Sequence, residues 1–277
     1  MTVHLTEHRN GFKQGFTPVT TTQDQQDPTG IAFAVLNLGK GQVHRDRPSG
    51  ETAWMLMAGQ ATFSVGKTKQ KISRSSLFDE GPSTLHVAAG TEVEILCDTD
   101  CEFTIYATAN KAQFSPKIYL PADVEEDQRG KGQVGDTCHR VVRTIFDRRN
   151  ADPAAELVLG EVITFPGKWS SYPPHHHPQP EIYHYRFTHP QGYGHAELGD
   201  QVLKVRNYDT VKIFDGFDHP QCAAPGYGMY YAWVIRHLPD RPYTVPEFAP
   251  EHNWVTKPGA EFWQPQSGNK PKGPSRG

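Results

Sequence analysis

Four residues in the second half of the chain have the types and spacing of a metal site. His175 and His177 lie one residue apart in the stretch YPPHHHPQPEIYHYR, Glu181 follows in the same stretch, and His219 comes from the distant stretch FDGFDHPQC. Side chains alternate faces along an extended segment, so His175 and His177 point the same way and the histidine between them points away. Three imidazoles and one carboxylate suit zinc, manganese, iron or nickel, and leave coordination positions open for substrate oxygens.

The alternative interpretation is a histidine-rich surface loop that binds no metal. The chain has 14 histidines, so neighbouring histidines can arise by chance. The spaced glutamate, the strand pattern after it and the distant histidine behind a glycine corner together favour the metal site. We therefore predict one divalent transition metal per chain, with zinc as the first choice and manganese or iron as alternatives.

Short strands separated by turns must position these residues. The chain contains 25 glycines and 23 prolines, and aromatic residues make up 11% of it. Short apolar or alternating runs such as IAFAVLN, TAWMLMA and MYYAWVIR are each closed by turn residues, whereas long helical periodicity is hard to find. This pattern is typical of an all-β sandwich or barrel.

The two halves of the sequence look like weak copies of each other. Glu51 precedes an apolar strand and a glycine turn, in the same relation as Glu181 in the second half. A segment rich in charge and glycine lies between the halves, and the C-terminal segment is rich in proline, glycine and lysine. We predict an N-terminal barrel at 1–120, a connector at 121–150, a C-terminal barrel at 151–255 and a mobile tail at 256–277.

The first half carries an incomplete version of the metal pattern. His44, Asp46 and Glu51 have the spacing H-x-D-x4-E, but Val93 stands where the second half has its fourth ligand. His86 lies nearby in a different register. We therefore expect a degenerate, structural first barrel that binds no metal.

Charge and composition exclude several classes of function. The formal net charge is −3, without the basic surface of a nucleic-acid-binding protein. The N-terminus has no apolar run of signal-peptide length, and the spacing of the four cysteines fits neither a CxxC motif nor a disulfide framework. Phosphate-binding loops and nucleophile elbows are absent. We expect a cytoplasmic protein that binds neither nucleic acid nor membrane.

The pattern H-x-H-x3-E with a later G-x-x-H resembles the two motifs of the cupin superfamily. The longer string GEVITFPGKWSSYPPHHH, EIYHYRF, PQGYG and APGYGMYYAWV is similar to the 5-deoxy-glucuronate isomerases of myo-inositol catabolism. This resemblance implies a bicupin with its metal in the second barrel, held by His175, His177, Glu181 and His219. It also implies aldose–ketose isomerisation of 5-deoxy-D-glucuronate to 5-dehydro-2-deoxy-D-gluconate. A related uronate isomerase of pectin breakdown shares the architecture.

Two tyrosines and two arginines are further candidates. Tyr183 and Tyr185 alternate in phase with Glu181, so both should face the barrel interior, where a hydroxyl can donate a hydrogen bond or move protons. Their alternative role is aromatic core packing. Arg140 and Arg143, in the motif RVVR that is similar to the family, could clamp a substrate carboxylate, or could be solvated or interface arginines.

We therefore predict a homo-oligomeric, metal-dependent ketol isomerase that acts on a small sugar acid. The alternatives are an isomerase of the related pectin-derived deoxy-uronate, a non-catalytic sugar-binding cupin and a metal-dependent dioxygenase. The stretch from His195 to Val205 departs from the family's sequence, and we expect this strand to line the pocket and to influence the choice of substrate.

Overall fold

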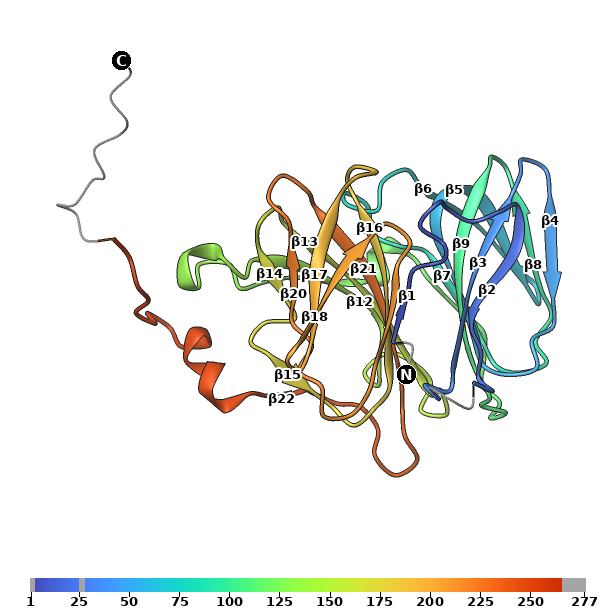
Figure 1. Cartoon of the computed structure of the whole chain (residues 1–277). Helices are drawn as coiled ribbons and strands as arrows, with labels where there is room; N and C mark the ends of the chain where they lie inside the picture. Colours follow the sequence, from blue (N-terminus) through green and yellow to red (C-terminus); the bar gives the residue numbers. More distant parts are fainter. Residues whose placement is uncertain (1–2, 25–27, 266–277) are drawn as a thin grey trace, which may run out of the picture.

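The computed structural model describes residues 3–24 and 28–265, which form two β-rich halves side by side (Figure 1). The helical segments among the described residues are three short 3-10 turns: η1 (Pro121–Asp123), η2 (Val134–Asp136) and η3 (Pro250–Thr256). None of the described helices is long and apolar enough to cross a membrane. The prediction of an all-β protein with two jelly-roll domains is confirmed.

The first half has two sheets that share the long strand β5 (Thr52–Val65). One sheet has the order β10 (Lys117–Tyr119), β7 (Thr84–Val87), β5, β9 (Cys101–Thr108), β3 (Ile31–Leu38), β2 (Gly15–Thr20). The other has the order β4 (Val43–Asp46), β8 (Val93–Cys97), β5, β6 (Thr68–Arg74). Strand β5 passes between the sheets at Gly59, where φ is +106° and a Cβ would lie 2.4 Å from the Asp100 carbonyl oxygen, so this position requires glycine.

The second half also has two sheets, and it contains the predicted metal ligands. The larger sheet has the order β1 (His4–Leu5), β19 (Thr210–Ile213), β16 (Glu181–Phe187), β21 (Met229–Arg236), β13 (Leu157–Thr164), β12 (Arg140–Phe146), β11 (Glu125–Arg129). The smaller has the order β14 (Trp169–Ser170), β20 (Gln221–Ala223), β17 (Tyr193–Leu198), β18 (Gln201–Arg206). Two short strands, β15 (His175–His176) and β22 (Glu247–Phe248), pair beside them.

Residues 125–146, predicted to lie in a connector, instead contribute β11 and β12 to the larger sheet of the second half. Strand β11 has the sequence EEDQR and is exposed throughout, because it forms the edge of the sheet, where charged side chains discourage pairing with other chains. That charge gave the segment the composition of a loop. Of the predicted mobile tail, residues 266–277 lie outside the described residues, and residues 257–265 contain neither helix nor strand.

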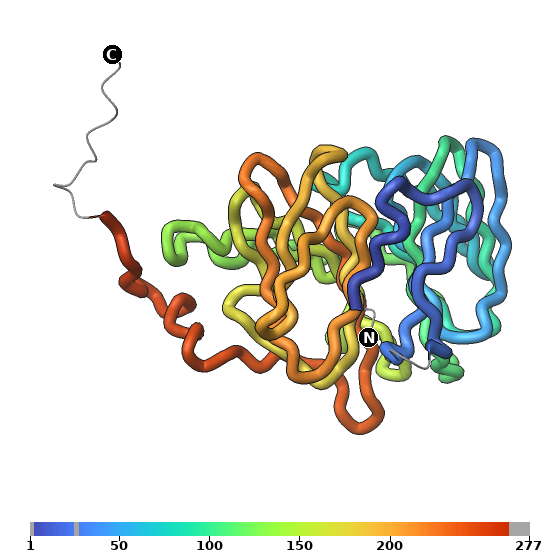
Figure 2. Tube along the Cα trace, in the orientation of Figure 1, coloured from blue at the N-terminus to red at the C-terminus, as the bar shows by residue number. Residues whose placement is uncertain are grey.

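The N-terminal segment also joins the second half before the chain enters the first (Figure 2). Strand β1 pairs with β19, and the buried carboxylate of Asp209 accepts hydrogen bonds from His4 at 2.8 Å and from Arg9 at 2.7 Å. The two halves are therefore interlocked in sequence, and the predicted boundary at residue 120 does not separate two independent segments.

Three apolar layers hold the molecule together, one inside each half and one between them. Along β5, Trp54 and Leu56 pack inside the first half, whereas Met55 and Met57 belong to the layer between the halves. Along β21, Tyr231 packs inside the second half and its neighbour Tyr230 lies in the middle layer. Both faces of these strands are buried, which explains why their sequences are continuously apolar.

Candidate metal centre and cavity

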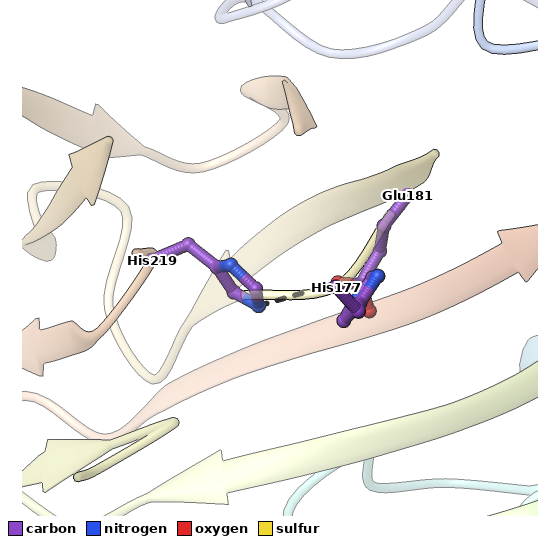
Figure 3. A group of neighbouring side chains, drawn as sticks. All are labelled: His177, Glu181 and His219. Atoms are coloured by element: carbon purple, nitrogen blue, oxygen red, sulfur yellow. Dashed lines mark hydrogen bonds and ion pairs between the residues drawn. The ribbon is translucent and has the colours of Figure 1, made fainter. Parts of the chain in front are cut away.

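The predicted metal ligands converge inside the second half. The ligand atoms of His177, Glu181 and His219 all lie within 4.8 Å of one another (Figure 3). Glu181 opens β16 and His219 lies in the loop between β19 and β20, so strand pairing brings together residues far apart in sequence. Glu181 Oε2 is 3.1 Å from His177 Nε2 and 3.5 Å from His219 Nε2.

His175, the fourth predicted ligand, lies next to His219. The two rings meet edge to face, with 4.7 Å between their centroids, and His175 stays outside the compact group of three. The backbone N–H of His219 donates to the His175 carbonyl oxygen at 3.3 Å, which ties the two segments together. His176 points away, as expected, and its Nδ1 lies 2.9 Å from Asp218 Oδ1.

Backbone carbonyls fix the tautomer of each of these three histidines. The contacts are His175 Nδ1 to the Pro173 oxygen at 2.9 Å, His177 Nδ1 to the Gln179 oxygen at 2.8 Å and His219 Nδ1 to the Phe217 oxygen at 2.9 Å. A carbonyl oxygen only accepts, so each Nδ1 carries a proton, and the neutral rings of His175 and His219 present a lone pair at Nε2. Burial alone would lower the pKa of His177, but the hydrogen bond and charge of Glu181 outweigh burial and raise it, so a bound metal would have to displace the proton from its Nε2. Histidines that bind metals are typically oriented in this way.

The donor set fits a divalent transition metal. His219 Nε2 is buried and has no hydrogen-bond partner among the described residues. Burial lowers the pKa of His175 to about 4, and burial together with the neighbouring histidines holds the pKa of His219 well below its ordinary value. Both rings are thus neutral, as metal ligation requires. Burial also raises the pKa of Glu181, and a bound cation would favour its ionised form.

A cavity of about 370 Å³ opens beside this group. Its walls include His175, His177 and Glu181, and its apolar floor comes from β13 and β21 through Val158, Val162, Trp233 and Ile235. The stretch from His195 to Val205, which was expected to line the pocket, contributes none of the lining residues within the described chain. It instead forms most of β17 and β18, at the far edge of the smaller sheet, where Val202 is exposed.

The two candidate tyrosines differ in whether they line the cavity. Both face the interior of the second half, but only Tyr183 lines the cavity, with its hydroxyl 3.2 Å from Ser171 Oγ. Tyr185 is fully buried and donates to Gln221 Oε1 at 2.8 Å. Burial raises the pKa of both tyrosines well above the ordinary value, so both hydroxyls remain protonated.

The two candidate arginines lie on opposite faces of β12. Arg140 lines the cavity together with the histidines. Arg143 instead contacts Glu161 at 2.9 Å and Glu126 at 2.8 Å, outside the cavity lining. Residues three apart on a strand point in opposite directions, so the two arginines cannot bind one substrate carboxylate together, and the prediction for Arg143 is wrong.

Ser171 and Tyr243 are among the residues of the cavity wall that sequence reasoning missed. Ser171 has φ of +49°, uncommon for a residue with a side chain, and its Oγ contacts the hydroxyls of Tyr183 and Tyr231. Tyr243 comes from the segment between β21 and β22, and its ring lies 5.0 Å from that of His177. Ser171 lies close to the histidine run, but nothing in the sequence placed Tyr243 there.

In the first half, the carboxylate of Glu51 is fully engaged in hydrogen bonds, two within this half and two to the second half. It contacts His86 Nε2 at 2.8 Å and accepts from the Asn110 side chain at 2.8 Å and from the backbone N–H groups of Glu156 and Leu157. This buried glutamate therefore has a structural role.

Two jelly-roll halves in one chain, with a histidine–glutamate group inside the second, define a bicupin. The KduI/IolB family model matches residues 4–255, so the chain belongs to the KduI/IolB family.

Curated relatives of similar length carry the name 5-deoxy-glucuronate isomerase. That of Geobacillus kaustophilus is 28% identical over 244 residues, covering 81% of this chain and 85% of the relative. That of Bacillus subtilis strain 168 is 26% identical over 254 residues, covering 84% and 90%. These names confirm the prediction that the chain is an isomerase.

Solved structures show the same fold. An IolB-like protein from Salmonella typhimurium LT2 superposes with a TM-score of 0.77 at 23% identity, covering 89% of this chain and 97% of that one. An oxalate decarboxylase from Lactobacillus farciminis, solved as a formate complex, gives a TM-score of 0.62 at 13% identity and covers 89% and 87%. At these identities the similarity concerns the fold alone.

Proposed function

We propose that this chain is a metal-dependent ketol isomerase that converts 5-deoxy-D-glucuronate to 5-dehydro-2-deoxy-D-gluconate in inositol catabolism. The observation that carries the proposal is the group of His177, Glu181 and His219, in which both Nε2 atoms lie within 3.5 Å of one carboxylate oxygen beside a cavity. The names of the curated relatives supply the substrate.

His175, His177, Glu181 and His219 would hold the metal, which supplies Lewis acidity toward a carbonyl oxygen and the neighbouring hydroxyl oxygen of a sugar. The chain's own groups orient the substrate around that centre. Tyr183 lines the cavity, and its hydroxyl, hydrogen bonded to Ser171, would bond a substrate oxygen. The apolar floor shields one side of the reacting carbons from water.

The test is an assay of the purified protein, loaded with zinc, manganese or iron, on 5-deoxy-glucuronate in deuterated water. NMR should show the 2-deoxy-5-keto acid, with deuterium at the new hydroxymethyl carbon if solvent reaches the transferred proton. An oxygen electrode should record no uptake, since uptake would favour the dioxygenase alternative. Treatment with a chelator should abolish turnover, and adding metal back should restore it.

The pectin-derived deoxy-uronate should be assayed in parallel, because the matching family model groups two kinds of member under one name. Faster turnover of that sugar would change the proposed substrate and leave the reaction class in place. If metal-loaded protein converts neither sugar, the isomerase proposal fails.

A further inference from the structure

Buried arginines in this protein are paired with carboxylates, with one exception. Four arginines among the described residues are less than one-tenth exposed: Arg74, Arg140, Arg143 and Arg186. Arg74 and Arg143 both contact Glu161, and Arg186 contacts Glu102 at 2.6 Å. For Arg140, the described residues provide no carboxylate within ion-pair distance.

The bonds that Arg140 makes do not neutralise its charge. One terminal nitrogen donates to the Cys138 carbonyl oxygen and the other to that of Tyr172, both at 2.9 Å, and the buried Nε has no partner among the described residues. Burying a cation without a counter-ion is unfavourable, and burial lowers the pKa of Arg140 accordingly. An anion in the cavity would provide the missing counter-charge.

Arg140 lies where one ligand can reach both it and the candidate metal ligands. It shares the cavity wall with His175, His177 and Glu181. Its guanidinium donates to the carbonyl of Tyr172, and the next carbonyl, that of Pro173, accepts from His175 Nδ1. The guanidinium of Arg140 is therefore held by the carbonyl of Tyr172, next to the carbonyl of Pro173 that orients His175, a predicted metal ligand.

The other arginines of the cavity wall already have acidic partners. Arg149 contacts Asp147 at 2.8 Å and Glu125 at 2.7 Å, and Arg129 contacts Asp127 at 3.0 Å. Both side chains are more than half exposed, where water screens their charge. Among the lining arginines, Arg140 is thus the one that needs a bound anion as its counter-charge.

We propose that Arg140 binds the carboxylate of the substrate. The ligand is then an acid whose carboxylate pairs with Arg140 while oxygen atoms further along the same chain face His175, His177 and Glu181. The identity of that acid as a uronate rests on the proposed function, whereas the anion site rests on the unpaired guanidinium. A guanidinium can offer several N–H groups to one carboxylate, so neutral sugars of the same length should bind far less well.

Two ligands that cannot isomerise separate binding from turnover. One is 5-deoxy-glucuronate reduced to the alcohol at C1, and the other is 5-deoxyglucitol, the neutral polyol with a hydroxymethyl group in place of the carboxylate. Calorimetry on the metal-loaded protein should show the acid binding about tenfold to hundredfold more tightly than the polyol, as for hydrogen bonds to a charged group. Equal affinities in the unmodified protein would overturn the proposal without any variant.

The variant Arg140→Met keeps the length of the side chain and removes its charge, and it should bind acid and polyol within about threefold of each other. Arg140→Lys should keep part of the preference. Arg149→Met is the matched control, because it removes a lining arginine that already has two carboxylate partners, and its preference for the acid should equal that of the unmodified protein. Circular dichroism of each variant checks that the fold is retained.

The outcomes separate this proposal from the proposed function. If the acid binds through Arg140 but 5-deoxy-glucuronate is not isomerised, the anion site stands and the isomerase substrate is wrong. If 5-deoxy-glucuronate is isomerised while Arg140→Met still prefers the acid, the isomerase stands and the anion site fails. If neither ligand binds, the anion site fails, and the isomerase proposal is decided by the turnover assay alone.

Discussion

Replacing His219 with alanine tests the candidate metal centre most directly. The substitution removes a buried Nε2 that lies 3.5 Å from Glu181 Oε2 and has no hydrogen-bond partner in the described part of the chain. His177 and Glu181 keep their positions, because His177 is held by the Gln179 carbonyl and Glu181 lies in β16. We expect the variant to fold and to lose most of its affinity for metal.

The size of the effect follows from linkage between binding and folding. A metal present at 100 times its dissociation constant stabilises the folded chain by about 2.7 kcal/mol. For domains of roughly this size, 1 kcal/mol shifts the melting temperature by about 2–4 °C, so metal should raise it by about 5–11 °C. If losing one ligand weakens binding about 100-fold, the remaining stabilisation is about 0.4 kcal/mol, or about 1 °C.

The assay is thermal unfolding of each protein with and without the metal. The difference between the two scans cancels any change that the substitution makes to the metal-free protein. His176→Ala is the matched control, because this histidine lies in the same segment but contacts Asp218 and is half-exposed. A metal-induced shift in His219→Ala as large as in the unmodified protein would refute the reasoning, as would loss of the shift in His176→Ala.

Three further predictions follow from the structure. Tyr183→Phe should lower kcat, because Tyr183 lines the cavity and its hydroxyl is the group proposed to bond the substrate. Tyr185→Phe should leave kcat nearly unchanged and cost about 1 kcal/mol in urea denaturation, and equal kcat values would contradict this distinction. Glu161→Gln should destabilise the fold by about 3–5 kcal/mol in the same assay, because buried Arg74 would lose its carboxylate; a change below about 1 kcal/mol would argue against it. Burial alone would raise the pKa of Glu51, but its hydrogen bonds outweigh burial and lower that pKa. The ionised carboxylate therefore stabilises the fold above the unfolded pKa of about 4.3, and this stabilisation is lost as the pH falls through the lower folded pKa. Urea midpoints measured from pH 5 to pH 3 should therefore fall less steeply in Glu51→Gln than in the unmodified protein, and parallel curves would be inconsistent with this assignment.

The boundary between the halves shows where composition misled the prediction. The charged segment EEDQR has the composition of a linker, yet it forms β11, because an edge strand needs a partner on one side only and can remain solvated on the other. Strand β1, near the N-terminus, pairs with β19 in the second half. Such long-range pairing leaves no local signal in the sequence.

The sequence by itself determined the fold class and pointed to the candidate ligands His177, Glu181 and His219. Strand and turn preferences act over a few residues, and His177 and Glu181 are only four residues apart in the chain, so both could be recognised from the sequence. The tertiary structure decided which neighbouring residues share the cavity with them. Strand β12 is buried on both faces, so its sequence gives no polarity pattern to show that Arg140 faces the cavity and Arg143 the acidic partners on the other side. Tyr243 reaches the site from a loop, and only the path of the whole chain could place it there.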